Sequence, residues 1–455
     1  MTRFRFSSVV WLCLVSLAGS FAARAVADDW PGFRGPHGLA VSPDTGLPVT
    51  WSDEQNIAWK RELPGPGSSS PIVVGKLVFL TCYSGYGLDK TSPGDQTKLE
   101  RNLVCVDVST GRILWQKSVA AALPEDSYGG MLADHGYASH TAATDGERVY
   151  AFFGKSGVVA FDLDGNQLWQ QKVGTRSDRM RFGSGASLCV YKNLVIVNAS
   201  IEGQAIYAFD GPTGRQVWKT DAEGYGGSYS TPVVVDVGKK AEIVVNMPDE
   251  IWGLDPQDGG LFWYSSSLRG ASNTTVVARD GIVFALAGGP GGSGAVAIRA
   301  GGQGDVTQSR QLWKKSIGSY VPSPVVLGEY LYWVDDKGIA YCVNASSGEQ
   351  VYRERLAGLG GGGRRGASSA VYASVVAADG KLYAVSRHNG TFVLAQGPKF
   401  ELLAHNEFES DPSDFNASPA VVQGRLLLRS DRALYCVGPG FSKISRTTNP
   451  VILSK

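Results

Sequence analysis

The sequence predicts an all-β fold: an eight-bladed β-propeller of four-stranded antiparallel blades, closed by an N-terminal strand that completes the last blade. A unit of three or four short runs rich in Val, Ile, Tyr and Phe recurs along the chain, split by Asp-Gly, Thr-Gly or Ser-Gly turns. Most repeats have a period of about 43 to 50 residues, the range expected of four-stranded blades. The last unit also lacks an outer strand, while an unmatched strand of that type precedes the first unit.

Residues 1–27 have the pattern of a secretory signal peptide. Arg3 and Arg5 precede the apolar stretch SSVVWLCLVSLAGSF, which is short for a membrane span, and AVA at Ala25–Ala27 supplies the small residues of a cleavage site. We expect a periplasmic or extracellular protein with no transmembrane segment after cleavage; an uncleaved anchor is the alternative. Cleavage removes three Arg and no acid, so the net charge changes from +1 to −2. This balance favours neither nucleic acid nor an anionic membrane as a partner.

The repeats divide the rest of the chain. We expect an N-terminal extension at 28–55, the propeller at 56–437 and a C-terminal tail at 438–455. In chain order, the eight units contain SSPIVVGKLVFLTC with LVCVDVSTGRILWQK, TAATDGERVYAFFGKSGVVAFDLDGNQLWQQ, ASLCVYKNLVIVNASIEGQAIYAFDGPTGRQVWK, STPVVVDVGKKAEIVVNMPDEIWGLDPQDGGLFWY, NTTVVARDGIVFALAGG with RQLWKK, PSPVVLGEYLYWVDDKGIAYCVNASSGEQVYRE, YASVVAADGKLYAVSRHNGTFVLAQGPKFELL, and ASPAVVQGRLLLRSDRALYCVG.

The turn before each outer strand is also repeated. STGRILWQK at Ser109–Lys117 returns as PTGRQVWKT at Pro212–Thr220. Gly111 and Gly214 allow the turn a positive φ at little cost. A Trp recurs near the end of the outer strand, where we expect it to pack one blade against the next: Trp115, Trp169, Trp218, Trp263 and Trp313.

The chain ends predict how the ring is completed. The eighth unit stops after LYCVG, whereas NIAWKREL at Asn56–Leu63 has the outer-strand pattern. Residues 56–63 are therefore the expected closing strand of blade eight, which would remove two open sheet edges.

Five cysteines follow the signal segment, with no C-x-x-C spacing of a metal or redox site. Cys105, Cys342 and Cys436 fall in the third-strand position that Ala or Gly occupies in other units, so we expect small core residues there. Equivalent positions in different blades are too far apart for a disulfide. A bridge between Cys82 and Cys105, in neighbouring strands of one blade, is not favoured but stays open.

The repeated P-V-V-x-x-G-x-V-Y…Y-A-x-D-x-x-T-G-x-x-x-W pattern resembles the propeller repeats of pyrroloquinoline-quinone (PQQ) enzymes and of their many non-catalytic relatives, over nearly all of 56–437. DDWPGFRGPHG and LPVTWSDEQNIAWK resemble the N-terminal signature of exported bacterial propellers of this type. The architecture is similar to that of the lipoprotein subunit of the outer-membrane β-barrel assembly machinery, although a lipid-attachment cysteine is missing.

The resemblance to quinoprotein dehydrogenases implies PQQ with Ca²⁺ above the channel. The sequence departs from those enzymes because it has neither their pair of adjacent cysteines nor a C-x-x-C-H haem site. We therefore assign no metal site and keep PQQ with Ca²⁺ as an open alternative to a protein without a cofactor, since fold alone does not decide function.

The candidate site lies in the segments that join an outer strand to the next inner strand, which emerge on one face near the axis. They contain Arg side chains that can bind carboxylates bidentately, beside His, Tyr, Asp and Asn. The alternative is that these polar loops only pair with one another. The candidate ligand-binding residues are His135, His140, Arg179, Arg181, Tyr229, Tyr320, Arg364, Arg365, Asp414 and Asn416.

The favoured function is an exported, non-catalytic binding or scaffold propeller, as a monomer, that engages a protein, a peptide or a small anionic ligand on the channel-mouth face. The alternative is a PQQ-dependent oxidoreductase of the alcohol or sugar dehydrogenase type, with Asp134, Asp178 or Asp414 as the base. A carbohydrate-active propeller would need a close pair of carboxylates, which spacing along the chain does not decide.

Overall fold

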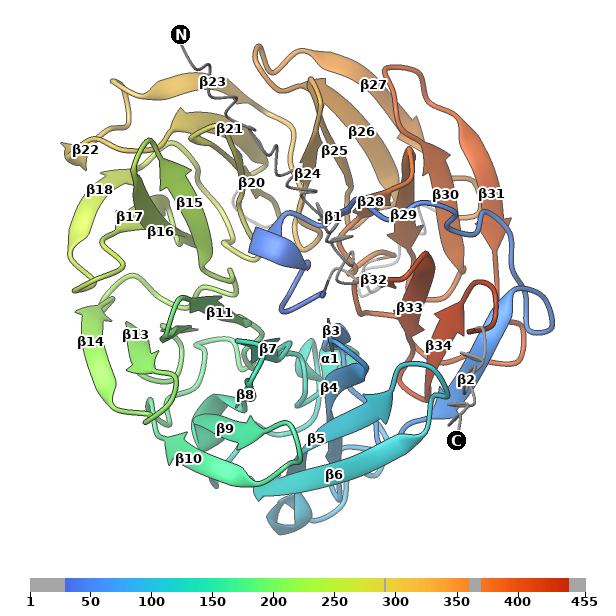
Figure 1. The fold of residues 1–455 in the computed structure, drawn as a ribbon. Coiled ribbons are helices and arrows are strands. Elements are labelled where there is room, and N and C mark those ends of the chain that lie inside the picture. The colour runs from blue at the N-terminus through green and yellow to red at the C-terminus, as the bar shows by residue number, and fades with distance from the viewer. Residues whose placement is uncertain (1–28, 290–291, 360–369, 442–455) are drawn as a thin grey trace, which may run out of the picture.

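The computed structural model describes residues 29–289, 292–359 and 370–441. Eight antiparallel sheets surround a central axis as the blades of a β-propeller, which confirms the predicted fold class (Figure 1). Each sheet has an inner strand beside the axis, two middle strands and an outer strand. The described residues include no helix that is long and apolar enough to cross a membrane.

The strands beside the axis are short. The inner strands are β3 (Ile72–Val74), β7 (Ala143–Thr144), β11 (Leu188–Tyr191), β15 (Val233–Val237), β19 (Val277–Arg279), β24 (Val325–Leu327), β28 (Val376–Ala378) and β32 (Ala420–Val422). The second strands are β4 (Leu77–Ser84), β8 (Arg148–Phe152), β12 (Leu194–Ala199), β16 (Lys240–Met247), β20 (Ile282–Ala287), β25 (Tyr330–Val334), β29 (Lys381–Val385) and β33 (Arg425–Arg429).

The two remaining strands complete each blade outward. The third strands are β5 (Glu100–Asp107), β9 (Val158–Asp162), β13 (Ala205–Asp210), β17 (Glu250–Leu254), β21 (Gly294–Arg299), β26 (Ile339–Asn344), β30 (Thr391–Ala395) and β34 (Ala433–Val437). The outer strands are β6 (Ile113–Ala120), β10 (Gln167–Gln171), β14 (Gln216–Asp221), β18 (Leu261–Ser265), β23 (Gln311–Lys315), β27 (Gln350–Arg355), β31 (Leu402–Asn406) and β2 (Ile57–Glu62).

The sheet of the last unit takes its outer strand from the N-terminal side of the chain. Its order is β2-β34-β33-β32, and β2 runs antiparallel to β34 with Ile57 opposite Val437 and Glu62 opposite Ala433. Figure 1 shows β2 and β34 side by side, although almost the whole chain separates them in sequence.

The recurrent Trp residues lie between neighbouring blades. The indole Nε1 of Trp115 donates to the Leu163 carbonyl at 3.0 Å, and that of Trp169 donates to the Gly211 carbonyl at 2.7 Å. Trp263 differs, because its Nε1 donates to Glu242 Oε2 of its own blade at 2.7 Å. Each such contact satisfies a buried donor while the ring fills the space between two sheets.

Register explains the small residue in the third strand. Cys105 lies opposite Trp115 and Cys436 lies opposite Trp59, as Ala160 lies opposite Trp169. A small side chain leaves room for the indole on the facing outer strand. Cys82 and Cys105 are both free and buried, so no disulfide joins them.

The segment before β2 crosses the channel. Residues 30–42, which we call the plug, contain the short 3₁₀ turn η1 (Pro36–Gly38) and the strand β1 (Val41–Ser42), which pairs in parallel with β28. Trp30 pairs with Val73 of the first blade, and the buried guanidinium of Arg34 donates to the Pro324 carbonyl of the sixth. The plug therefore joins blades that are not neighbours in the ring.

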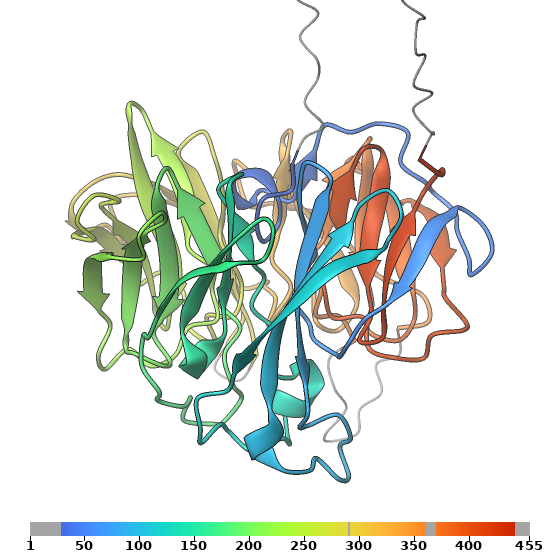
Figure 2. The same ribbon diagram turned by 60° about the horizontal axis from the view of Figure 1, so that its bottom comes forward.

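Three further short elements lie in connections: η2 (Gln96–Lys98), α1 (Leu132–His135) and η3 (Gly154–Ser156). Figure 2 shows the plug at one end of the channel and α1 near the other. We call the end with α1 the channel mouth.

Candidate functional site

A ring of hydroxyl groups surrounds the axis. Each blade contributes one Ser or Thr just before its inner strand, and we call this ring the hydroxyl belt. Its members are Ser70, Thr141, Ser187, Thr231, Thr275, Ser323, Ser374 and Ser418.

Backbone hydrogen bonds link the belt from blade to blade. The Ser70 N–H donates to Thr141 Oγ1 at 2.9 Å, and the same contact recurs through successive blades to Ser374 N–H and Ser418 Oγ, at 2.9 Å to 3.1 Å. Seven of the eight hydroxyls act as acceptors in these bonds, whereas Ser70 Oγ has no partner, and none of the belt hydroxyl protons has an acceptor among the described residues. The belt therefore offers hydroxyl donors to whatever occupies the channel.

The belt encloses a cavity of about 170 Å³ that we call the channel cavity. Phe33 of the plug lines its inner end. The other lining residues are Ser68, Met131, His135, Ser139, Phe182, Gly185, Tyr229, Asn273, Tyr320, Val321, Tyr372 and Asn416. The described lining thus combines aromatic rings with hydroxyl and amide groups and contains no Lys, Arg, Asp or Glu.

Three polar atoms of this lining have no hydrogen-bond partner among the described residues: Ser70 Oγ, Tyr229 Oη and Asn416 Oδ1. Ser70 is 2% exposed and Asn416 is 8% exposed. Burial also raises the pKa of the Tyr229 phenol, so this hydroxyl stays protonated. Because a buried polar group without a partner is costly, the three atoms indicate a site for water or a ligand with complementary polar groups.

The structure brings four of the ten predicted site residues to the channel cavity: His135, Tyr229, Tyr320 and Asn416. Both ring nitrogens of His135 have a hydrogen-bond partner: Nδ1 lies 2.6 Å from Ser139 Oγ, and Nε2 lies 2.7 Å from the Phe182 carbonyl oxygen. Burial lowers its pKa, which keeps the imidazole neutral. His135 therefore orients the cavity wall and is not free to titrate near neutral pH.

Asn416 links the cavity to the helix α1. Its Nδ2 donates to the Asp134 carbonyl at 2.8 Å and to Ser68 Oγ at 3.3 Å. These bonds fix the amide so that its free Oδ1 can accept a hydrogen bond from an occupant.

Asp414 lies beside the cavity in an ionic cluster. Its Oδ2 accepts from Arg387 Nη2 at 2.5 Å, and its Oδ1 lies 3.4 Å from His388 Nδ1. Asp134 Oδ1 is 3.6 Å from the same Arg387 nitrogen. The charges at this side of the mouth are therefore paired with one another.

The predicted Arg residues do not line the described cavity. Arg179 is exposed on the connection between β10 and β11, and Arg181 pairs with Asp126 Oδ1 at 2.8 Å while its side chain stays 70% exposed. Arg364 and Arg365 lie outside the described residues.

His140 lies in a separate, smaller cavity of about 20 Å³ that is lined by residues of the first, second and third blades. Its Nε2 is 3.0 Å from Ser184 Oγ, and Ser184 Oγ donates to Glu202 Oε1. Burial lowers the pKa of His140 to about 3 and raises that of Glu202 to about 7. Arg101, which pairs with Glu125, lines the same space.

This arrangement does not form a catalytic triad. In a triad a third group orients the imidazole through Nδ1, but His140 Nδ1 has no partner among the described residues. The space admits about one water molecule, which leaves no room for a substrate. The cluster is therefore a buried polar network between blades.

Sequence reasoning missed the belt, Phe33 and Glu202. The belt had a usable signal, because its members are separated by 71, 46, 44, 44, 48, 51 and 44 residues and each precedes an inner strand. Phe33 and Glu202 had no such signal, since neither belongs to the repeated pattern.

Comparisons with known proteins agree with this geometry. The family model described as "Outer membrane protein assembly factor BamB" matches residues 31–186 and 100–354, well over half of the chain. BamB of Xanthomonas campestris pv. campestris is 30% identical over 118 residues, which are 25% of this chain and 27% of that protein. The match therefore spans about a quarter of that relative's length.

Two solved structures share the fold. BamB from Moraxella catarrhalis gives a TM-score of 0.57 at 12% identity, over 85% of this chain and 98% of that one. The quinohemoprotein alcohol dehydrogenase ADHIIG from Pseudomonas putida HK5 gives 0.56 at 12% identity, over 91% and 81%. Identities this low show a common fold and do not choose between binding and oxidation.

The described channel lining does not fit PQQ. This cofactor carries three carboxylates, and the described lining holds no Lys or Arg to pair with their charge. The described residues also include no cluster of three or more His, Cys, Asp or Glu placed to hold a metal ion.

Proposed function

Because the chain belongs to the family of the outer membrane protein assembly factor BamB, we propose that it is a non-catalytic binding propeller whose channel mouth engages a protein or peptide. The observation that carries this proposal is the uncharged channel cavity with three unpartnered polar atoms. The signal-peptide pattern of residues 1–27 supports a site of action in the periplasm or outside the cell.

A polypeptide segment has the chemistry that this cavity requires. Its N–H groups can donate to Asn416 Oδ1, and its carbonyls can accept from Tyr229 Oη and the belt hydroxyls. The rings of Tyr320 and Phe182 supply apolar contact for a side chain. The cavity has room for about ten water molecules, which is enough for one large side chain and its peptide group.

The surroundings of the cavity suit a protein interface. An uncharged centre with a rim of paired ions, such as Arg387 with Asp414, is the usual arrangement of protein–protein contacts. We infer that a loop or chain end of the partner enters the cavity while the mouth segments contact its surroundings.

Site-specific photo-crosslinking tests the proposal. A photoreactive phenylalanine analogue replaces Tyr320 at the cavity, or Tyr330 at the start of β25 as a control away from the cavity. An outer-membrane β-barrel polypeptide diluted from urea serves as the probe. We expect adducts at position 320 and not at 330; equal labelling at both positions would contradict a site at the mouth.

Tyr229→Phe sharpens this test, because it removes only the unpartnered Oη. Loss of one hydrogen bond to the probe should weaken binding by about fivefold, near 1 kcal/mol, with no loss of protein stability. Unchanged affinity would argue that the hydroxyl does not face the occupant. Titration with PQQ and Ca²⁺ tests the alternative, and saturable binding with dye reduction would replace our proposal.

A further inference from the structure

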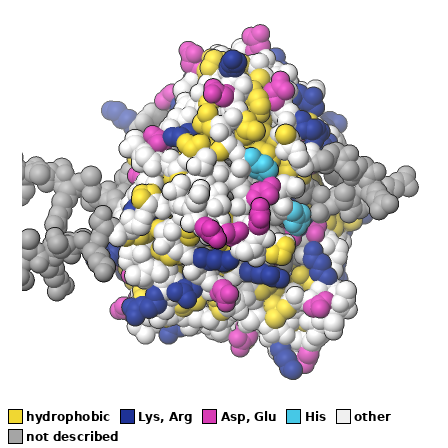
Figure 3. Space-filling view, turned by 90° about the vertical axis from the view of Figure 1, so that its right-hand side faces the viewer, with side chains coloured by type: hydrophobic (Ala, Val, Ile, Leu, Met, Phe, Trp, Pro, Cys, Tyr) yellow, Lys and Arg dark blue, Asp and Glu magenta, His cyan; other side chains and the backbone are white. Residues whose placement is uncertain are grey.

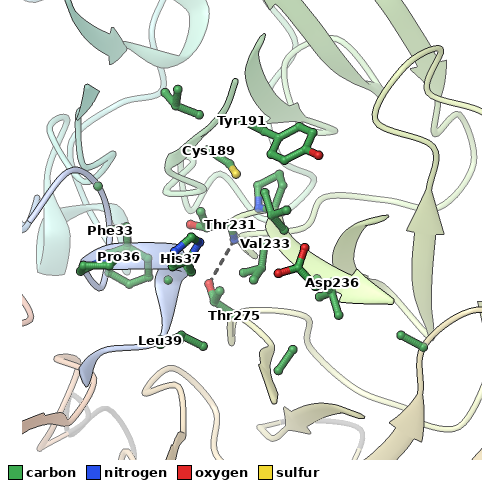
Figure 4. Close-up of a pocket in the computed structure, with 18 of the residues that line it drawn as sticks. Phe33, Pro36, His37, Leu39, Cys189, Tyr191, Thr231, Val233, Asp236 and Thr275 are labelled. Carbon is green, nitrogen blue, oxygen red and sulfur yellow. Dashed lines mark hydrogen bonds between the residues drawn. The ribbon is translucent and has the colours of Figure 1, made fainter. Parts of the chain in front are cut away.

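A second opening lies at the plug end of the channel. It is a groove of about 950 Å³ between the plug and the inner strands of the third, fourth and fifth blades, and we call it the plug groove. Figure 4 shows Phe33, Pro36 and His37 of the plug on one side, Cys189 and Tyr191 on another, and Val233 and Asp236 opposite them. Phe33 and the belt residues Thr231 and Thr275 line both this groove and the channel cavity.

The groove exposes the free edge of β15. This strand is the inner edge of its sheet, and it is the longest inner strand of the ring. Alternate residues of an antiparallel edge strand direct N–H and C=O away from their neighbour. No backbone partner outside its own ladder is found for Val233–Val237 among the described residues.

The seventh blade shows how the free edge of an inner strand can bind an added strand. There β1 pairs in parallel with the free edge of β28, and the Ala377 N–H donates to the Ala40 carbonyl at 2.8 Å. Counted from the belt residues Ser374 and Thr231, the position of Ala377 corresponds to Val234 of β15. The Val234 N–H contacts the Cys189 thiol of β11 at the groove, so it faces away from β16, and an added strand would replace this contact.

The fourth blade accepts an added strand at its other edge as well. The segment β22 (Gly304–Asp305) pairs in parallel with the outer strand β18, with Trp263 opposite Gly304. By contrast, the free inner edge of β15 has no added strand among the described residues. This sheet thus has one edge covered by the chain itself and one edge open to a groove.

Burial separates the inner strands that line the groove from β3, β28 and β32, whose residues are all buried. In β15, Val234 and Val237 are half-buried and Asp236 is exposed, and β11 and β19 are each buried only at their first residue. The outer edges on one side of the ring offer a poorer surface, because Figure 3 shows acidic and basic side chains interspersed with small apolar patches on the side of β27, β31 and β2. Charged side chains on edge strands oppose strand addition.

We propose that the free edge of β15 in the plug groove binds an extended segment of a partner polypeptide as an added β-strand. The segment carries alternating apolar and acidic side chains. Apolar side chains match Val233, Val235 and Leu39, while the Lys, Arg and Asp side chains of the groove have a cationic excess. These are Lys192, Arg279, Arg299 and Arg310 against Asp236 and Asp280.

A capped, fluorescein-labelled heptapeptide of alternating valine and glutamate is the probe. We expect saturable binding by fluorescence anisotropy and slower amide exchange in residues 231–240. The same peptide with alternate amides N-methylated keeps its side chains but loses backbone pairing, and should bind at least tenfold more weakly. Equal binding of the two peptides, or protection of an outer strand instead, would overturn the proposal.

Val234→Pro removes the free-edge N–H that does not bond to β16, a position where an edge strand tolerates proline. We expect at least tenfold weaker peptide binding with the circular dichroism spectrum unchanged. Val326→Pro is the matched control, since Val326 holds the equivalent position in β24 and does not line the groove. Equal loss in both variants would overturn the assignment to β15.

Two other occupants give different results. If residues 442–455 of the chain itself occupy the edge, removing them would expose the amides of 231–240 and raise peptide affinity. If a second copy occupies it, these amides would become protected as protein concentration rises, without peptide. Either result overturns the proposed partner segment.

Discussion

At the scale of single residues, Glu202 is a buried carboxyl group that keeps its proton to a higher pH in the folded protein than in the unfolded chain. It is 2% exposed, and burial raises its pKa from an ordinary value near 4.5 to about 7. Between these values the folded protein binds more protons than the unfolded chain, so the free energy of unfolding falls as pH rises. Stabilisation from the neutral carboxyl is complete below about pH 4.5 and is lost as pH rises to about 7.

Glu202→Gln should remove this dependence, because the amide resembles the protonated acid. Relative to wild type, the variant should gain about 3 kcal/mol of unfolding free energy between pH 4.5 and pH 8. Urea titrations at several pH values measure the difference, and the exposed Glu147→Gln is the control. Parallel curves for wild type and Glu202→Gln would show that the carboxyl is ionised throughout.

Close packing, in addition to a positive φ, requires glycine in the Thr-Gly turns. Gly214 has φ +71°, and a Cβ there would lie 2.6 Å from the Trp169 ring of the preceding blade. Gly111 meets Trp59 in the same way, at 2.6 Å. The repeated glycine therefore serves both the turn and the contact between blades.

Gly214→Ala should destabilise the protein by about 3 kcal/mol, the sum of left-handed strain and overpacking. Gly328→Ala is the control, because it has φ +54° and open space, and should lose only about 1 kcal/mol. Thermal or urea unfolding compares the two. Equal losses would mean that the Trp169 ring moves aside without cost.

At the scale of elements, the plug was the main feature that the sequence did not predict. The blades were predictable because each repeats hydrophobic runs and glycine turns that act locally. The path of residues 30–42 depends on contacts with residues far away in sequence, such as Trp30 with Val73 and Arg34 with Pro324. No periodicity within the segment encodes those contacts.

Trp30→Ala should release the plug while the blades stay folded. Trp30 is 1% exposed, and its loss removes about 3 kcal/mol or more of packing. The Ala377 amide, which bonds to Ala40, should then exchange at least tenfold faster, with amides of β29 unchanged. Hydrogen exchange by mass spectrometry measures both segments. Uniformly faster exchange would indicate instead that the plug unfolds together with the ring.

At the scale of the whole molecule, the ring explains why some site residues were predictable and others were not. The rule that outer-to-inner connections gather at one face correctly brought His135, Tyr229, Tyr320 and Asn416 to one cavity. The same rule did not distinguish side chains that face the central axis from side chains that lie between blades, as that of His140 does. That distinction depends on how a side chain turns from its strand, which spacing along the chain does not specify.

The pairing of β2 with β34 makes a prediction about how the ring opens. If unfolding begins where the chain ends meet, a disulfide between Glu62→Cys and Ala433→Cys, which are paired in register, should oppose it. Its closed loop of roughly 370 residues should add about 6 kcal/mol by restricting the unfolded chain, whereas a loop of about 15 residues adds about 3. Lys381→Cys with Ala395→Cys, paired between β29 and β30, provides that short-loop control. Thermal unfolding with and without reductant measures both gains. Because loop length alone predicts the larger gain of the first pair, the unfolding rate decides where the ring opens. Slower unfolding with the first disulfide than with the control disulfide would indicate that β2 leaves β34 early, and an unfolding rate that the first disulfide leaves unchanged would place the first opening elsewhere in the ring.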